Sequence, residues 1–257
     1  MPLLEVDNCT KQFGGLTAVN GFTLRMEPGE LVGLIGPNGA GKTTAFNLLT
    51  GVYSPTSGSI RFEGRSIAGR RPSAIAAAGI SRTFQNIRLF NQMTVLDNVR
   101  TASHLHFKPS LLDAMLQTQG LKKAEAKVTA EAHALLERFG VDRYASELAC
   151  NLPYGEQRRL EIARALATRP KLLLLDEPAA GMNTQEKVAL MEQIRTLQRD
   201  FDLTILLIEH DMRLVMSICR RILVLDQGDT IAEGAPQEIQ QDPAVIEAYL
   251  GEPEESA

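Results

Sequence analysis

The hydrophobic and polar positions of the chain follow a strand pattern near both ends and a helical pattern in the middle. Residues 3–6 and 22–26 alternate in part between apolar and polar side chains, which is typical of half-buried strands. Mostly apolar segments at residues 31–35, 171–175 and 203–208 predict buried strands. These segments predict a sheet core assembled from the two ends of the chain.

Shorter elements are expected beside these strands. A helix is predicted at residues 43–50 and a further strand at residues 59–62. Another helix is predicted at residues 184–198, between the last two buried strands. Asn183 and Glu186, three residues apart at its start, predict a capping box. Helices and strands therefore alternate, which is typical of an α/β fold.

The C-terminal part of the chain predicts a hairpin. Residues 221–225 and 230–232 flank the sequence Asp226-Gln227-Gly228-Asp229, whose turn residues favour a tight connection between two strands. The last residues, 251–257, contain three glutamates, and we expect them to fray.

Between residues 88 and 150 the strand pattern gives way to helical periodicity. The apolar positions of residues 121–139 fall on one helical face, and lysines and glutamates occupy much of the rest. No linker rich in Pro, Ser or Gly bounds this part. We therefore expect one domain, residues 1–257, with a core of about residues 1–87 and 152–257 and an inserted helical subdomain of about residues 88–151.

Composition narrows the class of protein. Of the 257 residues, 44% are hydrophobic and 23% charged, which are ordinary values for a globular protein. The net charge of −4 gives the chain no bulk charge for coating nucleic acid. The three cysteines, Cys9, Cys150 and Cys219, are far apart and form no C-x-x-C pair, which favours a reducing compartment. With no long apolar run or signal peptide, we expect a soluble intracellular protein that can still dock on a membrane complex.

A glycine-rich segment fits the pattern G-x-x-x-x-G-K-[ST] between a predicted strand and a predicted helix. Its glycines allow backbone N–H groups to turn toward phosphate oxygens, Lys42 supplies a charge to the β- and γ-phosphates, and Thr43 offers a hydroxyl to Mg²⁺. A tight turn that merely joins strand to helix is the alternative, and the complete motif in this context favours the phosphate loop. The loop consists of Gly36, Pro37, Asn38, Gly39, Ala40, Gly41, Lys42, Thr43 and Thr44.

Two carboxylates follow the apolar strand of residues 171–175. Asp176 can hold Mg²⁺ beside Thr43, and Glu177 can orient and deprotonate an attacking water. A solvated acidic pair at a strand end is the alternative. The phosphate loop elsewhere in the chain favours the catalytic interpretation.

The order of these motifs resembles a known family. A phosphate loop, Gln85 after a short strand, a helical insert, a segment at residues 151–157, the acidic pair and His210 follow one another as in the nucleotide-binding subunits of ABC transporters. More narrowly, essentially the whole chain resembles the LivG-type subunit of branched-chain amino acid importers. The stretches that carry this narrower resemblance are residues 13–16, 36–44, 82–85, 89–95, 158–164, 176–181, 208–212 and 248–251.

The resemblance implies a fold and further roles. The fold is a P-loop NTPase ABC ATPase core, a mixed sheet flanked by helices, with an antiparallel β subdomain and an inserted α-helical subdomain. Phe13 would stack on adenine, unless it is a core phenylalanine. Gln85 would contact Mg²⁺ and the attacking water, so that Thr43, Gln85 and Asp176 surround the ion. His210 would contact the γ-phosphate of ATP and pair with Glu177.

The resemblance also implies partners. Two ATP-binding subunits would pair head to tail, the second being LivF-like, on two membrane permeases at the cytoplasmic face of the inner membrane, with an external substrate-binding protein. Leu89, Phe90 and Met93 would line a docking groove for the permeases, or be ordinary core residues. The signature segment, which would act on the partner's ATP, is Leu152, Pro153, Tyr154, Gly155, Glu156 and Gln157.

Two segments depart from the family pattern. Pro153 and Tyr154 stand where the signature usually has Ser and Gly, and Asn183 stands where many ABC proteins carry Asp. Proline has neither a hydroxyl nor an N–H, so this chain offers fewer donors to a γ-phosphate there. The signature face is therefore weaker than the phosphate-loop face.

The sequence is compatible with more than one function. The first is an ATPase that energises import of branched-chain amino acids. The second is the same ATPase for another cargo, such as urea, short amides or other amino acids, or for export. The third is a non-transport ABC ATPase acting on nucleic acid or in translation, disfavoured because the chain has no room for a coiled coil or a second cassette. A GTPase is disfavoured because no N-K-x-D motif occurs.

Overall fold

The computed structural model describes residues 1–105 and 118–250. The acidic tail that we expected to fray, residues 251–257, lies outside the described residues. The chain divides into two compact units. One, here called the nucleotide unit, consists of residues 1–82 and the chain from residue 171 onward; the other, the helical unit, is Thr83–Pro170.

A six-stranded mixed sheet forms the centre of the nucleotide unit. Its strand order is β10-β9-β3-β8-β7-β6, and every neighbouring pair is parallel except the antiparallel pair of β10 with β9. The strands are β3 (Leu31–Ile35), β6 (Ile80–Arg82), β7 (Leu172–Asp176), β8 (Thr204–Ile208), β9 (Arg221–Asp226) and β10 (Asp229–Gly234). Every residue of β3, β7 and β8 is buried, as their mostly apolar sequences predict.

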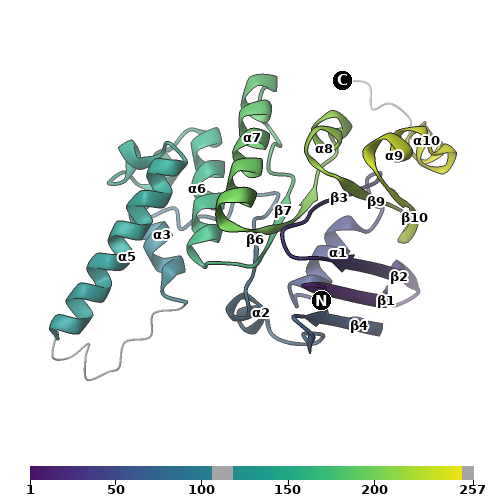
Figure 1. Cartoon of the computed structure of the whole chain (residues 1–257), viewed down its shortest axis with the longest axis horizontal. Helices are drawn as coiled ribbons and strands as arrows, with labels where there is room; N and C mark the ends of the chain where they lie inside the picture. Colours follow the sequence, from purple (N-terminus) through teal and green to yellow (C-terminus); the bar gives the residue numbers. More distant parts are fainter. Residues whose placement is uncertain (106–117, 251–257) are drawn as a thin grey trace. The chain divides into compact units, whose positions relative to one another are not determined.

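Helices cover this sheet because its strands are apolar on both faces (Figure 1). On β3, Val32 and Leu34 join the cluster that contains Phe46 of α1, whereas Gly33 faces Val215 of α8. Alternate residues of one strand thus pack against two different helices. The helices of this unit are α1 (Lys42–Leu49), α2 (Pro72–Ala78), α7 (Thr184–Phe201), α8 (Met212–Ile218), α9 (Pro236–Gln241) and α10 (Pro243–Leu250).

A four-stranded antiparallel sheet completes the nucleotide unit, in the order β2-β1-β4-β5. Its strands are β1 (Leu4–Phe13), β2 (Leu16–Met26), β4 (Ser57–Phe62) and β5 (Arg65–Ser66). β1 and β2 are longer than the sequence predicted. Register shifts interrupt their pairing, and buried, half-buried and exposed positions do not alternate regularly along them. The expected combination of a mixed sheet and an antiparallel β subdomain is confirmed.

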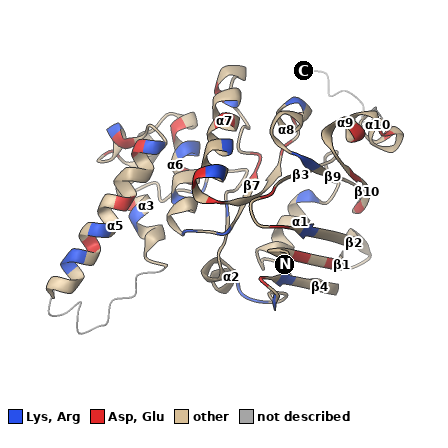
Figure 2. Cartoon of the chain, in the orientation of Figure 1, with Lys and Arg blue, Asp and Glu red and all other residues tan. Residues whose placement is uncertain are grey.

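The helical unit contains α3 (Val95–Ser103), α5 (Gln119–Arg138) and α6 (Tyr154–Ala167), with short 3₁₀ turns at Asp142–Tyr144 and Ala149–Asn151. α6 packs against α3 and α5 and so belongs to this unit, whereas the sequence placed the end of the insert near residue 151. Figure 2 shows Lys, Arg, Asp and Glu along α5, in keeping with its amphipathic pattern. Among the described residues, no helix combines the length and apolarity needed to cross a bilayer.

Two local predictions are confirmed. The Asn183 side chain accepts the Glu186 N–H at 3.0 Å, and the Glu186 carboxylate accepts the Asn183 N–H at 3.0 Å, so the capping box is complete. At the β9–β10 hairpin, Gln227 and Gly228 have φ of 46° and 92°. Two consecutive residues with positive φ are what a tight hairpin turn requires.

Candidate functional site

The phosphate loop connects β3 to α1 and depends on two glycines. Gly36 has φ 149° and Gly41 has φ 100°. A Cβ atom on Gly36 would lie 2.0 Å from the Leu225 carbonyl oxygen, and one on Gly41 would lie 2.5 Å from the Ala18 carbonyl oxygen. Backbone atoms cannot yield as a flexible side chain can, so only glycine permits this turn at both positions.

Lys42 is the buried cation of this loop. Its Nζ donates to the Gly36 carbonyl at 2.6 Å and to the Pro37 carbonyl at 2.7 Å. Thr43 and Thr44 follow in the first turn of α1, where Thr43 is exposed and Thr44 half-buried. That turn contains no acidic residue and no side-chain cap, so the positive end of the helix is available to an anion.

The sheet order brings three separate segments to one edge. β3 pairs in parallel with β8, and β8 pairs in parallel with β7. At its carboxyl end, β3 leads into the phosphate loop and β8 leads into Glu209 and His210. Asp176 is the last residue of β7, and Glu177 follows it. In open α/β sheets ligands bind outside the carboxyl ends of the strands. The phosphate loop, Asp176-Glu177 and Glu209-His210 therefore lie at the same edge of this sheet.

Glu177 and His210 lie beside each other at this edge. The Glu177 N–H donates to the Ile208 carbonyl at 2.9 Å, which ties the end of β7 to the end of β8. His210 Nδ1 lies 3.9 Å from Glu177 Oε2 and 3.9 Å from Glu209 Oε2. Glu177 also has φ 46°, a left-handed conformation that costs a non-glycine residue roughly 1 kcal/mol or more. Such backbone strain is concentrated at functional sites.

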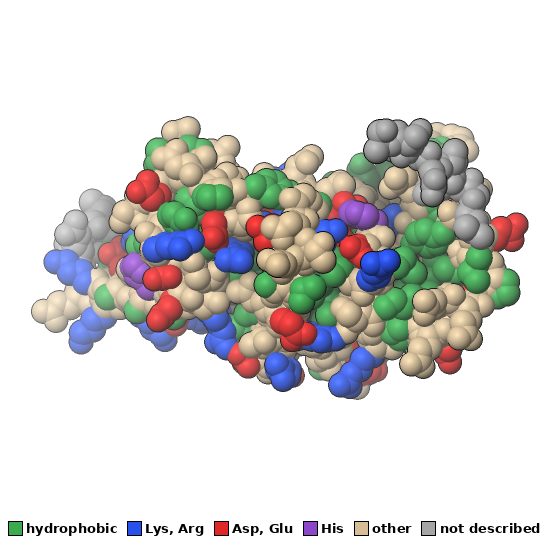
Figure 3. Space-filling view, turned by 90° about the horizontal axis from the view of Figure 1, so that it is seen from above, with side chains coloured by type: hydrophobic (Ala, Val, Ile, Leu, Met, Phe, Trp, Pro, Cys, Tyr) green, Lys and Arg blue, Asp and Glu red, His purple; other side chains and the backbone are tan. Residues whose placement is uncertain are grey.

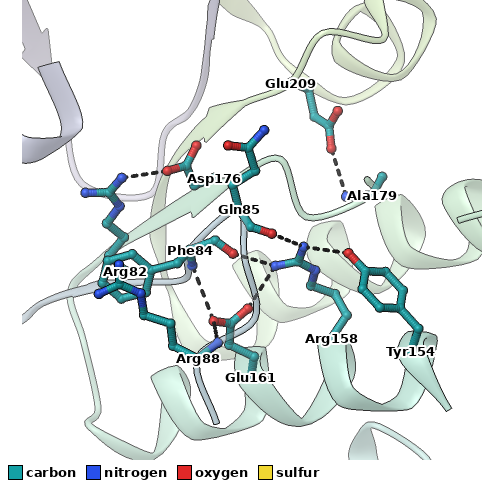
Figure 4. Close-up of polar contacts among 10 residues, drawn as sticks. All are labelled: Arg82, Phe84, Gln85, Arg88, Tyr154, Arg158, Glu161, Asp176, Ala179 and Glu209. Atoms are coloured by element: carbon teal, nitrogen blue, oxygen red, sulfur yellow. Dashed lines mark hydrogen bonds and ion pairs between the residues drawn. The ribbon is translucent and has the colours of Figure 1, made fainter. Parts of the chain in front are cut away.

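Asp176 forms an ion pair that sequence reasoning missed. Arg82 Nη2 lies 2.6 Å from Asp176 Oδ2, and both side chains are about 95% buried, with exposures of 5% and 4% (Figure 4). Arg82 Nη1 also donates to Asn47 Oδ1 at 2.6 Å. The sequence signal was an arginine at the end of the short buried strand β6, next to Ile80 and Ser81. Arg82 therefore neutralises the carboxylate that the sequence assigns to the metal.

Glu209 is a second residue that the sequence did not single out. Its carboxylate is 1% exposed and accepts the Ala179 N–H at 2.8 Å, joining the segments that follow β7 and β8 (Figure 4). Burial raises the pKa of Glu209, while the hydrogen bond from the Ala179 N–H and the neighbouring His210 oppose this shift. The available signal was a charged residue placed directly after an apolar strand.

Phe13 lies at the end of β1 and is 41% exposed. Its ring meets the Tyr53 ring edge-on, with centroids 5.0 Å apart, and Lys11 Nζ lies 5.0 Å from its centroid. Phe13 is therefore not a core phenylalanine, which was the alternative to an adenine-stacking role.

The helical unit holds Gln85 and the signature segment. Gln85 is exposed, and its backbone carbonyl accepts a hydrogen bond from Arg158 Nη2 at 2.6 Å. Pro153, with φ −55°, is the N-cap residue of α6, and the helix begins at Tyr154. The proline therefore does not interrupt the helix. Among the apolar residues that could form a docking groove, Phe90 is 49% exposed.

The remaining signature residues surround the start of α6. Leu152 is buried, and its carbonyl accepts a hydrogen bond from Gln157 Nε2 at 2.8 Å. Glu156 pairs with Arg159 at 3.3 Å and with Arg143 at 3.2 Å. A Cβ atom on Gly155 would meet no atom within 4 Å, so the backbone there is open to an approaching group.

The groups of the nucleotide unit are chemically suited to a nucleotide with Mg²⁺. Among the described residues, no group of three or more His, Cys, Asp or Glu side chains could hold a metal ion alone. Asp176 and Thr43 instead offer one carboxylate and one hydroxyl. Mg²⁺ is commonly bound by one or two carboxylates together with substrate phosphates, so this donor set fits an ion that arrives with its nucleotide.

An apolar pocket of about 400 Å³ lies between α8 and the last two helices. Figure 3 shows hydrophobic side chains gathered over this part of the surface. The pocket is lined by Met212, Arg213, Met216, Ile239, Gln240, Val245, Ile246 and Tyr249. Much of this lining belongs to the C-terminal segment, away from the phosphate loop in sequence.

Comparison with known proteins gives consistent matches. Residues 19–180 match the ABC transporter family, and residues 230–255 match the family described as "Branched-chain amino acid ATP-binding cassette transporter". The chain is 48% identical to the high-affinity branched-chain amino acid transport ATP-binding protein BraF of Pseudomonas aeruginosa and 49% identical to LivG of Escherichia coli, each over 98% of both chains. Its structure resembles the ADP conformation of MJ1267, an ATP-binding cassette of an ABC transporter, with a TM-score of 0.84, 31% identity and coverage of 98% and 100%.

Proposed function

Because the chain belongs to the ABC transporter family, we propose that it is the ATP-hydrolysing subunit that energises a high-affinity importer of branched-chain amino acids. The observation that carries this proposal is the convergence of three segments at the carboxyl edge of β3, β8 and β7. These segments are the phosphate loop, the pair Glu209-His210 and the pair Asp176-Glu177. Together they offer a phosphate cradle, a metal ligand and a base.

Binding begins at the phosphate loop. Lys42 now holds two loop carbonyls at 2.6 and 2.7 Å, and a phosphate oxygen is a stronger partner for its ammonium than a neutral carbonyl. Backbone N–H groups of residues 36–44 and the α1 N-terminus add donors around the phosphates. Phe13, exposed at the end of β1, offers its ring to adenine.

Thr43 and Asp176 would hold magnesium, and Gln85 is proposed as a further ligand. When bound, the ion supplies charge neutralisation between the β- and γ-phosphates of ATP. Arg82 Nη2 contacts Asp176 Oδ2, and the two oxygens of a carboxylate can contact an arginine and a metal ion at the same time. Asp176 would therefore serve the metal without losing Arg82.

Glu177 is proposed as the base that orients and deprotonates the attacking water. Its backbone is fixed to β8 by the hydrogen bond to Ile208, so the carboxylate stays at the edge of the sheet. His210, 3.9 Å from that carboxylate, orients it and contacts the γ-phosphate. Gln85 positions the same water. These side chains supply proton transfer and charge stabilisation, the two effects that phosphoryl transfer needs most.

The second half of each site comes from a partner. The γ-phosphate also needs donors on the side away from the phosphate loop, and a helix N-terminus of a partner can provide them. We propose a head-to-tail dimer with a LivF-like ATPase, in which α6 and residues 152–157 face the partner's nucleotide. The dimer would sit on two permeases at the cytoplasmic face of the inner membrane, served by an external binding protein, with Phe90 among the docking residues.

Branched-chain amino acids are the favoured cargo. Relatives that are 48% and 49% identical over 98% of the chain are named for branched-chain amino acid transport, and the C-terminal match carries a similar description. The alternative cargoes considered from the sequence, urea and short amides, are not favoured. A non-transport function is likewise not favoured.

The ATPase rate as a function of protein concentration tests the shared site. The purified chain should bind Mg·ATP and hydrolyse it slowly, and addition of a LivF-like partner should raise the rate per subunit. A Lys42→Ala variant is the matched control for contaminating ATPase. A fast rate that is independent of concentration and of partner would contradict the proposal, because a monomer would then suffice.

A further inference from the structure

A fully buried ion pair in the helical unit contacts the backbone of the segment that carries Gln85. Arg158 and Glu161 lie one turn apart on α6, with 2.9 Å between Nη1 and Oε2, and their side chains are 0% and 1% exposed. Isolated buried charges are costly, so such a pair persists only where further hydrogen bonds satisfy it. Here those bonds go to residues 84–88.

The guanidinium group of Arg158 holds two consecutive carbonyls. Nη1 donates to the Phe84 carbonyl at 2.6 Å, and Nη2 donates to the Gln85 carbonyl at 2.6 Å (Figure 4). A planar fork with two donor nitrogens fixes both the position and the orientation of the peptide it contacts. The backbone at Gln85 is thus held directly by α6.

The carboxylate of Glu161 holds the same segment by its N–H groups. Oε1 accepts the Arg88 N–H at 3.1 Å and the Phe84 N–H at 3.4 Å (Figure 4). The Arg158–Glu161 ion pair therefore binds both backbone N–H groups and backbone carbonyls of residues 84–88. Four contacts of opposite polarity leave the segment little freedom to shift along α6.

Tyr154 connects this pair to the signature segment. Its hydroxyl lies 3.2 Å from Arg158 Nη2, and its ring lies 5.8 Å from the centre of the guanidinium group. This residue is one of the two that depart from the usual signature pattern. Its side chain therefore has a structural partner of its own on α6.

We infer that Arg158 and Glu161 are positioning residues that fix Gln85 to the start of α6, so that Gln85 and the signature segment move as one rigid element. The inference rests on the proposed function, because Gln85 acts on water and Mg²⁺ only in that account. Its consequence is that a change at Arg158 or Glu161 affects hydrolysis only through the position of Gln85.

The test is a double-mutant cycle in the assembled transporter. Arg158→Lys keeps the charge and loses the fork, and Glu161→Gln keeps the acceptor oxygen and loses the ion pair. We expect Arg158→Lys to lower kcat by about 10- to 100-fold, since a displacement near 1 Å can have that effect, with KM for ATP nearly unchanged. In a Gln85→Ala background the same change should lower kcat less than threefold.

Two further measurements keep the test decisive. Tyr154→Phe removes only a hydroxyl and folds even if Arg158→Lys does not, and it should lower kcat by a smaller factor that also vanishes with Gln85→Ala. Hydrogen exchange at the Phe84 and Arg88 amides should speed up in Glu161→Met, which removes the acceptor oxygen of both N–H groups, whether or not the protein hydrolyses ATP. The control is Arg169→Gln, which breaks the exposed pair with Glu131 in the same unit and should change neither quantity.

The outcomes separate the inference from the function on which it rests. An inactive wild-type complex overturns the proposed function, and unchanged exchange at Phe84 and Arg88 overturns the inference by itself. If kcat losses from Arg158→Lys and Gln85→Ala multiply, the ion pair acts independently of Gln85 and the inference is wrong. Losses that do not multiply, together with faster exchange, support it.

Discussion

Replacement of Arg82 by methionine should destabilise the protein strongly, because it would remove one member of a buried ion pair with Asp176. The pair is 2.6 Å apart and about 95% buried on both sides, and Arg82 also donates to Asn47 at 2.6 Å. Removal of one partner from a buried ion pair costs about 3–5 kcal/mol. Methionine is chosen because it preserves an apolar contact with Phe46, whose ring lies 5.4 Å from the guanidinium group.

The effect can be read from urea unfolding and from the melting temperature. A loss of about 3–5 kcal/mol corresponds to a Tm lower by roughly 6–20 °C for a chain of this size. The matched control is Arg169→Met, whose pair with Glu131 is also 2.6 Å long but exposed. An exposed pair contributes about 0–1 kcal/mol, so this control should melt within a few degrees of wild type.

Two results would refute the reasoning. The first is an Arg82→Met variant within about 1 kcal/mol of wild type, which is the range of an exposed pair. The second comes from the double variant Arg82→Met/Asp176→Leu. Since replacement of both charges by apolar groups removes the remaining buried carboxylate, the double variant should recover part of the lost stability. A double variant less stable than Arg82→Met would show that packing, and not the buried charge, sets the loss.

Three further predictions follow from individual side chains. Burial raises the pKa of Glu209, so the stability linked to its neutral form is lost as pH rises through that pKa. Glu209→Gln mimics the neutral form and still accepts the Ala179 N–H, so its unfolding free energy relative to wild type should increase from pH 5 to pH 8. An equal difference in unfolding free energy between variant and wild type at the two pH values would contradict this. Burial raises the pKa of Cys9 to about 11 and that of Cys219 to about 12, whereas Cys150 is exposed. Mass spectrometry after thiol labelling at pH 8 should therefore find one label on the native protein and three labels after denaturation. A second label on the native protein would count against the fold around Cys9 or Cys219. In a heterodimer with a LivF-like partner, Glu177→Gln removes the base of this chain's own ATP site, so only the ATP site that faces Pro153 can hydrolyse ATP. We expect this heterodimer to turn over more slowly than one in which the partner's base is removed instead, and Pro153→Ser should raise its rate modestly or not at all. A faster site facing Pro153 would refute the asymmetry.

Local signals in the sequence predicted much of the nucleotide unit. Residues 31–35 form β3 with the predicted bounds, because a continuous apolar run between turns leaves one choice. The capping box at Asn183 and the hairpin turn at Gln227 also depend only on neighbouring residues. The lengths of β1 and β2 could not be predicted in the same way, since register shifts break their alternation.

The polar contacts around the site are not encoded locally. Arg82 and Asp176 are 94 positions apart, and Arg158 and Phe84 are 74 apart. No spacing rule connects residues at such distances. The sequence identified Asp176 and Gln85 through motifs, but the residues that hold them became visible only when the sheet order and the packing of α6 were known.

ATP-driven uptake of labelled leucine into proteoliposomes tests the central claim most directly. The vesicles would contain the complete complex with wild-type chain or with Glu177→Gln, and ATP binding would be measured on the same preparations. The account predicts uptake that requires ATP with the wild-type chain, and nearly unchanged ATP binding without uptake with Glu177→Gln, because the side chain acts on water and contributes little to ground-state affinity. Near-wild-type uptake by the variant would contradict the account.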